Sequence, residues 1–171
     1  RLTVATWNIN SVRLRSGLVS QMLRDHLPDV LCLQETKCPD DRFPAAEFRK
    51  LGYEHVAICG QKGYHGVAIL SRAPLEDIRK GLPGDATDEQ SRYIEAVIPA
   101  GNSTLRVASI YLPNGNPVDT EKFPYKLAWM DRLRALAAER LDTFTPFAVL
   151  GDFNVCPTDA DLAPGTLPPT D

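Results

Sequence analysis

The sequence predicts an α/β fold with a mixed β-sheet, and three observations lead to this prediction. Short apolar runs of strand length alternate with amphipathic segments of helical period in the N-terminal part. Two β-rich runs near the middle are joined through Gly101-Asn102, which is typical of an antiparallel hairpin. A long amphipathic segment then leads into another apolar run at residues 147–150. With 171 residues, 43% of them hydrophobic, the chain has the size of one domain, residues 1–171, with a sizeable core.

The N-terminal segment predicts a strand, a helix and a second strand. Residues 2–8 are largely β-branched or apolar and favour a strand. Ser16 is expected to cap a helix whose apolar residues recur at helical spacing until Pro28 ends it. Residues 30–33 are a short apolar run of the kind found in buried strands. This succession indicates an α/β unit.

The middle of the chain predicts several short elements around one polar stretch. We expect a short helix at residues 44–51 and strands at residues 53–59, 67–70, 93–98 and 105–110. Residues 73–91 are polar and rich in turn-forming residues, so they are expected to be an excursion over the surface.

The C-terminal third predicts the longest helix and one more buried strand. The helix is expected at residues 124–141 and leads into the strand at 147–150, whereas residues 157–171 are expected to form a loop. The apolar residues predicted to share the buried face of the helix are Trp129, Leu133, Leu136, Ala137 and Leu141.

Composition excludes some classes of protein. The net charge of −3 and the pI of about 5.6 argue against a surface that binds polyanions everywhere, although a local basic rim remains compatible with them. No apolar stretch reaches the length of a membrane span, and the N-terminus shows no signal pattern. We therefore expect a cytoplasmic protein without a membrane partner, unless a leader was trimmed. The four cysteines form no C-x-x-C pair and are expected to be reduced thiols.

Polar side chains follow several of the apolar runs at the point where each predicted strand ends. These residues are Asn8, Glu35, Tyr111, Asp152 and Asn154. If the strands lie side by side in one sheet, their ends meet along one edge, where ligands enter open α/β sheets. Carboxylates, amides and a phenol suit Mg²⁺ or Mn²⁺, whereas zinc would call for His or Cys at motif spacing.

This set of side chains suits phosphoryl chemistry. A metal ion would neutralise a phosphate oxygen, a carboxylate would orient or deprotonate the attacking water, and Tyr111 and Asn154 would donate hydrogen bonds to phosphoryl oxygens. Taken singly, each residue also has an ordinary explanation. Glu35 would be a surface group, Tyr111 a half-buried anchor, and Asp152 with Asn154 a turn at a strand end. Jointly they favour a phosphodiesterase or phosphatase.

Five motifs, in this order, resemble those of the exonuclease III-type AP endonucleases, which belong to the endonuclease/exonuclease/phosphatase superfamily with the DNase I-like fold. They are Thr6-Trp7-Asn8-Ile9-Asn10-Ser11-Val12-Arg13, Leu33-Gln34-Glu35-Thr36-Lys37, Gly66-Val67-Ala68-Ile69-Leu70-Ser71, Tyr111-Leu112-Pro113-Asn114-Gly115 and Gly151-Asp152-Phe153-Asn154-Val155. The resemblance covers the whole chain, and the loop at 114–117 with the helix entry at 122–126 looks like the bacterial branch.

The resemblance implies a four-layer α/β sandwich and Mg²⁺-dependent cleavage of the phosphodiester 5′ to an abasic site, with Mn²⁺ as an alternative metal. It also implies 3′-to-5′ exonuclease and 3′-phosphatase or 3′-phosphodiesterase activity on duplex DNA. The partner would therefore be duplex DNA containing abasic sites or 3′-blocked ends, bound by a monomeric bacterial DNA-repair enzyme.

The resemblance also implies roles for individual residues. The implied metal-binding residues are Glu35, Asn8 at or beside the metal, Asp152 and Asn154. The implied catalytic residues are Glu35, Tyr111, Asp152 and Asn154. The implied DNA contacts are Arg13, Asn114 and Arg92. His65 receives no defined role from the motifs.

The chain departs from the family pattern at its C-terminus. The family continues with an Arg-x-Asp stretch and a terminal Ser-Asp-His-Pro stretch that complete the site, and His26, His55 and His65 lie in the wrong contexts to replace that histidine. We therefore expect a domain incomplete at its C-terminus, with apolar surface exposed. Two alternatives stay open: a phosphatase or phosphodiesterase of the same superfamily acting on a small or lipid phosphate, and an inactive DNA-binding fragment.

Overall fold

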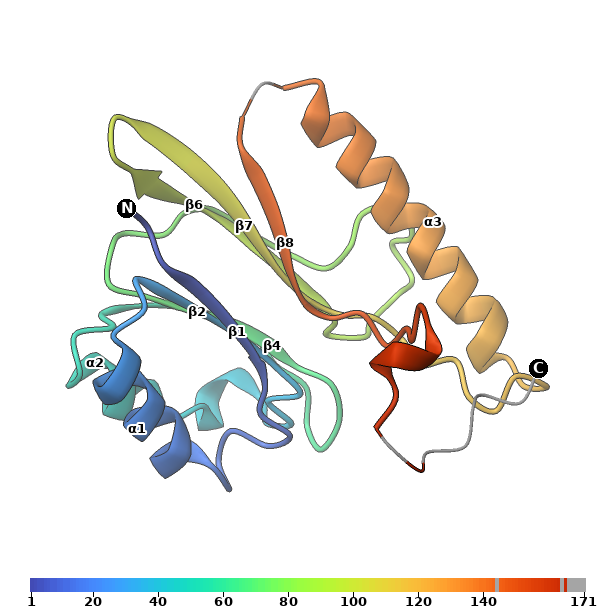
Figure 1. Cartoon of the computed structure of the whole chain (residues 1–171), viewed down its shortest axis with the longest axis horizontal. Helices are drawn as coiled ribbons and strands as arrows, with labels where there is room; N and C mark the ends of the chain where they lie inside the picture. The colour runs from blue at the N-terminus through green and yellow to red at the C-terminus, as the bar shows by residue number, and fades with distance from the viewer. Residues whose placement is uncertain (144, 164, 166–171) are drawn as a thin grey trace.

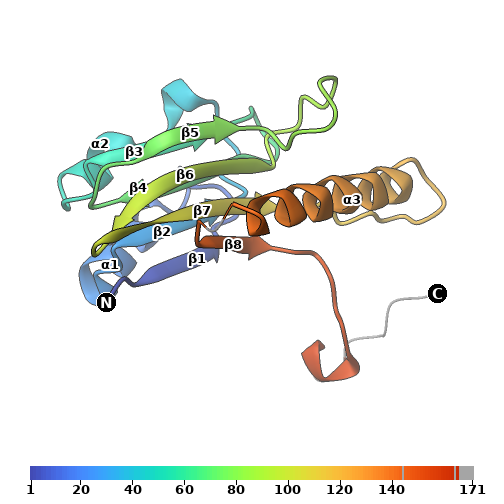
Figure 2. The same cartoon turned by 90° about the horizontal axis from the view of Figure 1, so that it is seen from above.

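Two four-stranded mixed sheets pack face to face, with helices on the outer face of each (Figure 1). The structure is a computed structural model, and it describes residues 1–143, 145–163 and 165. Seen from above, the strands of one sheet lie over those of the other (Figure 2). The predicted mixed α/β architecture is confirmed, and the layering agrees with the sandwich that the resemblance implied.

The first sheet has the strand order β1-β2-β4-β3. Its strands are β1 (Val4–Asn8), β2 (Val30–Gln34), β3 (His55–Cys59) and β4 (Val67–Ser71). β1 and β2 are parallel, whereas β4 runs antiparallel to both β2 and β3. Helices α1 (Ser16–His26) and α2 (Ala45–Arg49) cover its outer face, where Leu23 and Phe48 are fully buried against the sheet.

The second sheet has the order β5-β6-β7-β8. Its strands are β5 (Glu76–Lys80), β6 (Tyr93–Ala100), β7 (Ser103–Tyr111) and β8 (Phe147–Asp152). β5, β6 and β7 are successively antiparallel, and β7 and β8 are parallel. The long helix α3 (Lys122–Leu141) covers the outer face through the buried Trp129 and Leu136.

Alternation along β6 and β7 separates two cores. Ile94, Ala96, Ile98 and Val107 point between the two sheets and pack against the first sheet, whereas Tyr93 belongs to the core beneath α3. The short 3₁₀ turns, Asp40–Arg42 and Asp159–Asp161, lie outside these cores.

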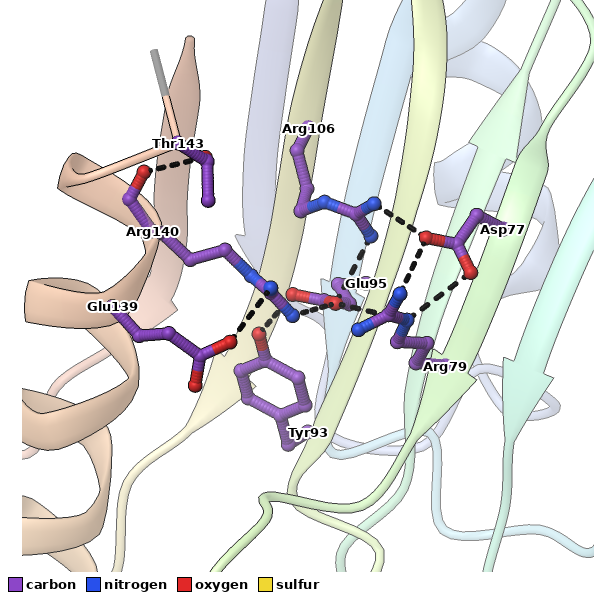
Figure 3. Close-up of polar contacts among 8 residues, drawn as sticks. All are labelled: Asp77, Arg79, Tyr93, Glu95, Arg106, Glu139, Arg140 and Thr143. Atoms are coloured by element: carbon purple, nitrogen blue, oxygen red, sulfur yellow. Dashed lines mark hydrogen bonds and ion pairs between the residues drawn. The ribbon is translucent and has the colours of Figure 1, made fainter. Parts of the chain in front are cut away.

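A buried ion cluster joins α3 to the second sheet (Figure 3). The Glu95 carboxylate on β6 is only 1% exposed. Its Oε1 accepts hydrogen bonds from Arg106 Nη1 on β7 at 3.0 Å and from Arg140 Nη2 on α3 at 2.9 Å. Tyr93 Oη donates to Oε2 at 2.6 Å, and Arg79 Nε on β5 lies 3.8 Å from Oε1. One carboxylate thus holds three strands and the C-terminal end of α3 together.

The prediction that residues 73–91 form only a surface excursion was wrong, because this segment contains β5. All five residues of β5 are exposed, and they pair with β6 at the edge of the second sheet with an irregularity between Glu76 and Arg79. An exposed edge strand needs no apolar residues, so the hydrophobic pattern does not reveal it.

Three details of the predicted helices differ in the structure. Ser16 is the first residue of α1 rather than its cap, because Arg15 holds the cap position and no side chain caps the helix. Leu141, expected on the buried face of α3, is 79% exposed. The helix begins at Lys122, ahead of the predicted residue 124. The predicted loop at 157–171 contains the second 3₁₀ turn, and its residues 164 and 166–171 lie outside the described part of the chain.

The structure also bears on the predicted cysteines and on the predicted exposed apolar surface. The four cysteines are free thiols, as predicted. Large apolar side chains are exposed, as expected, and they include Leu127 and Met130 on the outer face of α3 at 48% and 37%. Within the described ranges, no helix is both long and apolar enough to cross a membrane.

Candidate active site

The ends of two parallel strand pairs meet where the two sheets face each other. Asn8 ends β1 and Glu35 follows β2 in the first sheet, whereas Tyr111 ends β7 and Asp152 ends β8 in the second. The condition that these strands lie in one sheet is not met, because they belong to two sheets. Each sheet contributes one parallel pair, and the edge strands β1 and β8 lie side by side (Figures 1 and 2).

Asn8 links the two predicted acidic residues. Its Nδ2 donates to Glu35 Oε1 at 2.8 Å and to Asp152 Oδ2 at 2.9 Å. Its Oδ1 accepts the backbone N–H of Asn10 at 3.1 Å, which orients the amide. Both carboxylates are therefore held against one amide nitrogen, which lies between them.

Glu35 is kept ionised by its neighbours. It lies just past β2 with a positive φ of 52°, which turns its side chain out of the strand direction. Burial raises the pKa of Glu35, but hydrogen bonds from Asn8 and Lys37 and the charge of Lys37 outweigh that effect and bring the pKa below its ordinary value. Lys37 Nζ lies 2.8 Å from Glu35 Oε2 and also donates to Asn10 Oδ1 at 2.6 Å.

Tyr111 is held by a stacked arginine and stays protonated. The Arg92 guanidinium carbon lies 4.8 Å from the centre of the Tyr111 ring, and Arg92 Nη1 donates to the Tyr111 carbonyl at 3.1 Å. Burial and the negative charge of Glu35 raise the pKa of Tyr111 to about 12. At neutral pH its hydroxyl is therefore a hydrogen-bond donor.

His65 lies beside the same tyrosine. The two ring centroids are 6.1 Å apart, and burial together with the charge of Arg92 lowers the pKa of His65 to about 4. The imidazole is neutral at physiological pH. His65 and Tyr111 line a pocket of about 370 Å³ that also contains Arg92 and Asn114.

Asp152 and Asn154 form a tight turn at the end of β8. Asp152 Oδ1 accepts the backbone N–H of Asn154 at 2.9 Å, and Asn154 Nδ2 donates to the Leu112 carbonyl at 2.8 Å. The turn needs Gly151, because a Cβ at its φ of 147° would collide with the Ile110 carbonyl oxygen. The turn therefore attaches the end of β8 to the chain that follows β7.

The three predicted DNA contacts differ in their surroundings: one lines a pocket, one is buried and one is exposed. Asn114 lines the pocket beside Tyr111, and its Oδ1 accepts the Asn116 backbone N–H at 2.8 Å. Arg92 is only 8% exposed and is engaged by Tyr111 and by Gln90 Oε1 at 2.7 Å. Arg13 is exposed and makes no hydrogen bond to the carboxylate cluster within the described residues.

Three residues of the site were missed or only partly foreseen from the sequence. Lys37 stands two positions after Glu35 in the quoted motif, so its position was the available signal. Lys126 lies in the helix entry at 122–126 that resembles the bacterial branch, and it contacts the carbonyls of Asn154 and Asn114. Gln34 is 1% exposed and donates to Ser109 Oγ at 3.0 Å, which ties the two sheets together directly behind the site.

The donor set fits a hard divalent cation more closely than a zinc ion. Glu35 and Asp152 supply carboxylate oxygens from two sheets, and the described residues hold no group of three or more His, Cys, Asp or Glu that would form a closed metal site. Mg²⁺ is commonly held by one or two carboxylates, with waters and substrate phosphates completing its shell. The lowered pKa of Glu35 suits such a role, because a ligand carboxylate must be ionised.

The fold and the order of the site motifs place the chain in one protein family. The Endonuclease/Exonuclease/phosphatase family matches residues 5–168, and the chain belongs to that family. The family membership predicted from the motifs is thereby confirmed.

Particular relatives lie among DNA-repair nucleases. The chain is 36% identical over 161 residues to exodeoxyribonuclease III of Haemophilus influenzae, covering 94% of this chain and 60% of that protein. It is similar to the solved 3′ phosphatase NExo from Neisseria bound to a product DNA hairpin, with a TM-score of 0.87 and 38% identity, covering 94% of this chain and 60% of that one. An AP endonuclease from Archaeoglobus fulgidus gives a TM-score of 0.82 at 41% identity, covering 95% and 61%.

The chain spans about 60% of the length of each of these three relatives. These relatives include an exodeoxyribonuclease, a 3′ phosphatase and an AP endonuclease, so the chain is homologous to phosphodiester and phosphomonoester hydrolases that act on DNA.

Proposed function

We propose that this protein is a Mg²⁺-dependent DNA-repair nuclease that cleaves the phosphodiester 5′ to abasic sites and removes or trims blocked 3′ ends of duplex DNA. The observation that carries the proposal is the amide of Asn8 holding Glu35 and Asp152 together beside the protonated Tyr111. Two ionisable oxygen ligands and a phenolic donor at one sheet junction suit phosphoryl transfer.

Glu35 and Asp152 would hold the magnesium ion, with the Asn154 side chain beside it. When bound, the ion would neutralise charge on the phosphate oxygens. Asn8 would keep the two carboxylates in place, as residues behind a metal centre commonly do. Lys37 would balance the charge of Glu35 until the cation binds, because its ammonium group lies 2.8 Å from that carboxylate.

Tyr111 would donate a hydrogen bond to a non-bridging oxygen of the scissile phosphate. Its pKa of about 12 keeps the hydroxyl protonated, and the stack with Arg92 fixes the ring. Asp152 would orient the attacking water or receive a proton from it, because it lies at the same junction and its two oxygens are already anchored by Asn8 and Asn154.

DNA is the proposed substrate because the relatives named above are an exodeoxyribonuclease, a 3′ phosphatase and an AP endonuclease, and the phosphatase was solved with a product DNA hairpin. Asn114, in the pocket beside Tyr111, and Arg13, exposed after β1, would contact backbone phosphates. Arg92 would act mainly on Tyr111, since its guanidinium is already engaged there.

The test is incision of a duplex oligonucleotide with one abasic analogue, in Mg²⁺ and in EDTA, beside an undamaged duplex. We expect metal-dependent cutting on the 5′ side of the lesion, and loss of cutting in Glu35→Gln. A duplex with a 3′-phosphate end tests the 3′ activity in the same assay. Cleavage of inositol phosphates or other small phosphate esters, without cleavage of either duplex, would contradict the proposal in favour of a small-phosphate hydrolase.

A further inference from the structure

Lys126 connects the two loops that carry the asparagines of the candidate site. It lies in the first turns of α3, and its Nζ donates to the Asn154 carbonyl at 2.6 Å and to the Asn114 carbonyl at 3.2 Å. Asn154 follows β8 and Asn114 follows β7, so a single ammonium group ties the exits of two neighbouring strands.

The position of the Lys126 side chain is set by Gly115, which packs against its stem, and by the anchored helix that carries it. The φ of Gly115 is +80°, and a Cβ there would lie 2.7 Å from Lys126 Cδ and 3.3 Å from its Cβ. The absence of a side chain at Gly115 therefore makes room for the lysine stem. The helix that carries Lys126 is itself anchored by the buried Trp129 and by the Arg140 contact with Glu95.

The turn that Lys126 contacts is otherwise held by few bonds. Asn154 has a positive φ of 47°, which costs less for asparagine than for most residues but still needs support from its surroundings. Its N–H bonds to Asp152 and its side chain to Leu112, so the bond from Lys126 supplies the partner for its carbonyl. Losing that bond would leave the Asn154 carbonyl without this partner and loosen the turn that its N–H shares with Asp152.

We propose that Lys126 is a positioning residue that fixes Asn154 and Asp152 for the phosphoryl reaction, although it does not touch the substrate itself. This inference rests on the proposed function, which assigns those two residues to catalysis. Burial lowers the pKa of Lys126, and the negative charge of Asp152 partly opposes that change. The lysine and this carboxylate therefore interact electrostatically.

The first test does not depend on activity. Hydrogen exchange of the Asn154 backbone and side-chain amides is measured by NMR in the wild type, Lys126→Met and Lys126→Arg, with Lys50→Met as the matched control on an exposed site. We expect about tenfold faster exchange in Lys126→Met, partial restoration in Lys126→Arg and no change in the control. Unchanged exchange in Lys126→Met would overturn the proposal.

The second test separates positioning from substrate binding. Lys126→Met should lower kcat on the abasic duplex about tenfold, because it displaces reacting groups. KM should change less, because Asn114, whose carbonyl Lys126 also contacts, is still held by the bond from the Asn116 N–H to its side chain at 2.8 Å. Gly115→Ala should reproduce this effect by displacing the stem, and the double variant should lose no more than either single one. A rise in KM with unchanged kcat would make Lys126 a DNA contact and contradict the inference.

The two tests also distinguish this inference from the proposed function. If the wild type cuts no duplex but Lys126→Met still accelerates exchange at Asn154, Lys126 does hold the Asn154 turn, and the nuclease assignment fails. If the wild type cuts and Lys126→Met neither lowers kcat nor changes the exchange, the nuclease assignment stands, and the positioning role of Lys126 fails.

Discussion

Asn8 and Asp152 lie 144 positions apart in the sequence, yet Asn8 Nδ2 donates to Asp152 Oδ2 at 2.9 Å. The same nitrogen donates to Glu35, so one amide joins the edge strands of two different sheets. The site therefore exists only when both sheets have packed, and its geometry depends on their relative position.

Removing the Asn8 amide should weaken the metal site more than the fold. In Asn8→Ala the two carboxylates lose their shared donor and repel each other, so the Mg²⁺ concentration for half-maximal activity should rise about 10- to 100-fold. Thermal unfolding should change little, since the residue is at a strand end and only partly buried. Magnesium titrations of incision activity measure the effect, and an unchanged magnesium requirement would contradict it.

The hydroxyl of Tyr111 should matter for the rate but not for stability. Tyr111→Phe keeps the ring that Arg92 stacks on and removes the donor, so kcat should fall about 10²- to 10³-fold at nearly unchanged unfolding temperature. Because the pKa of Tyr111 is raised to about 12, its ionisation should not limit the rate of the wild type between pH 6 and pH 10. A rate that falls in that range in the wild type but not in Tyr111→Phe would show that the tyrosine ionises earlier.

Glu35 should make stability depend on pH in the acid range. Its pKa is lower in the folded chain than in the unfolded chain, so its contribution is fully present above the unfolded pKa of about 4.3 and is lost as pH falls through the folded pKa. Urea unfolding between pH 6 and pH 3 should therefore show a smaller loss of stability in Glu35→Gln than in the wild type. Parallel pH curves for the two proteins would argue against the lowered pKa.

Local sequence patterns foretold the positions of most site residues but not how they meet. Glu35, Tyr111 and Asp152 each follow an apolar run, and that change of character is visible in the sequence. Which runs share a sheet is decided by tertiary packing, so the division of the site between two sheets was not predictable from those patterns.

Residues that act through long side chains or at exposed edges leave weaker signals. β5 is entirely exposed and its sequence has no apolar alternation, so its pairing with β6 depends on its place along the sheet edge. Lys126 reaches the carbonyls of Asn114 and Asn154 only because α3 returns past both loops. Neither relationship is encoded at short range, although the motifs that resemble the family mark the surrounding loops.

The buried carboxylate of Glu95 should be among the most sensitive positions of the second sheet. It is 1% exposed and faces three guanidinium groups, so Glu95→Gln leaves buried positive charge uncompensated and should cost about 3–5 kcal/mol of unfolding free energy.

Glu139→Gln is the matched control. Glu139 also pairs with Arg140, at 3.4 Å, but its side chain is 68% exposed, so its loss should cost less than about 0.5 kcal/mol. Urea unfolding of both variants at neutral pH measures the difference. Equal, small losses would mean that water screens the cluster and that other contacts of α3, among them the buried Trp129 and Leu136, hold the helix. A large loss confined to Glu95→Gln, with slower incision as well, would show that the ion cluster keeps α3, and with it Lys126, in place over the site.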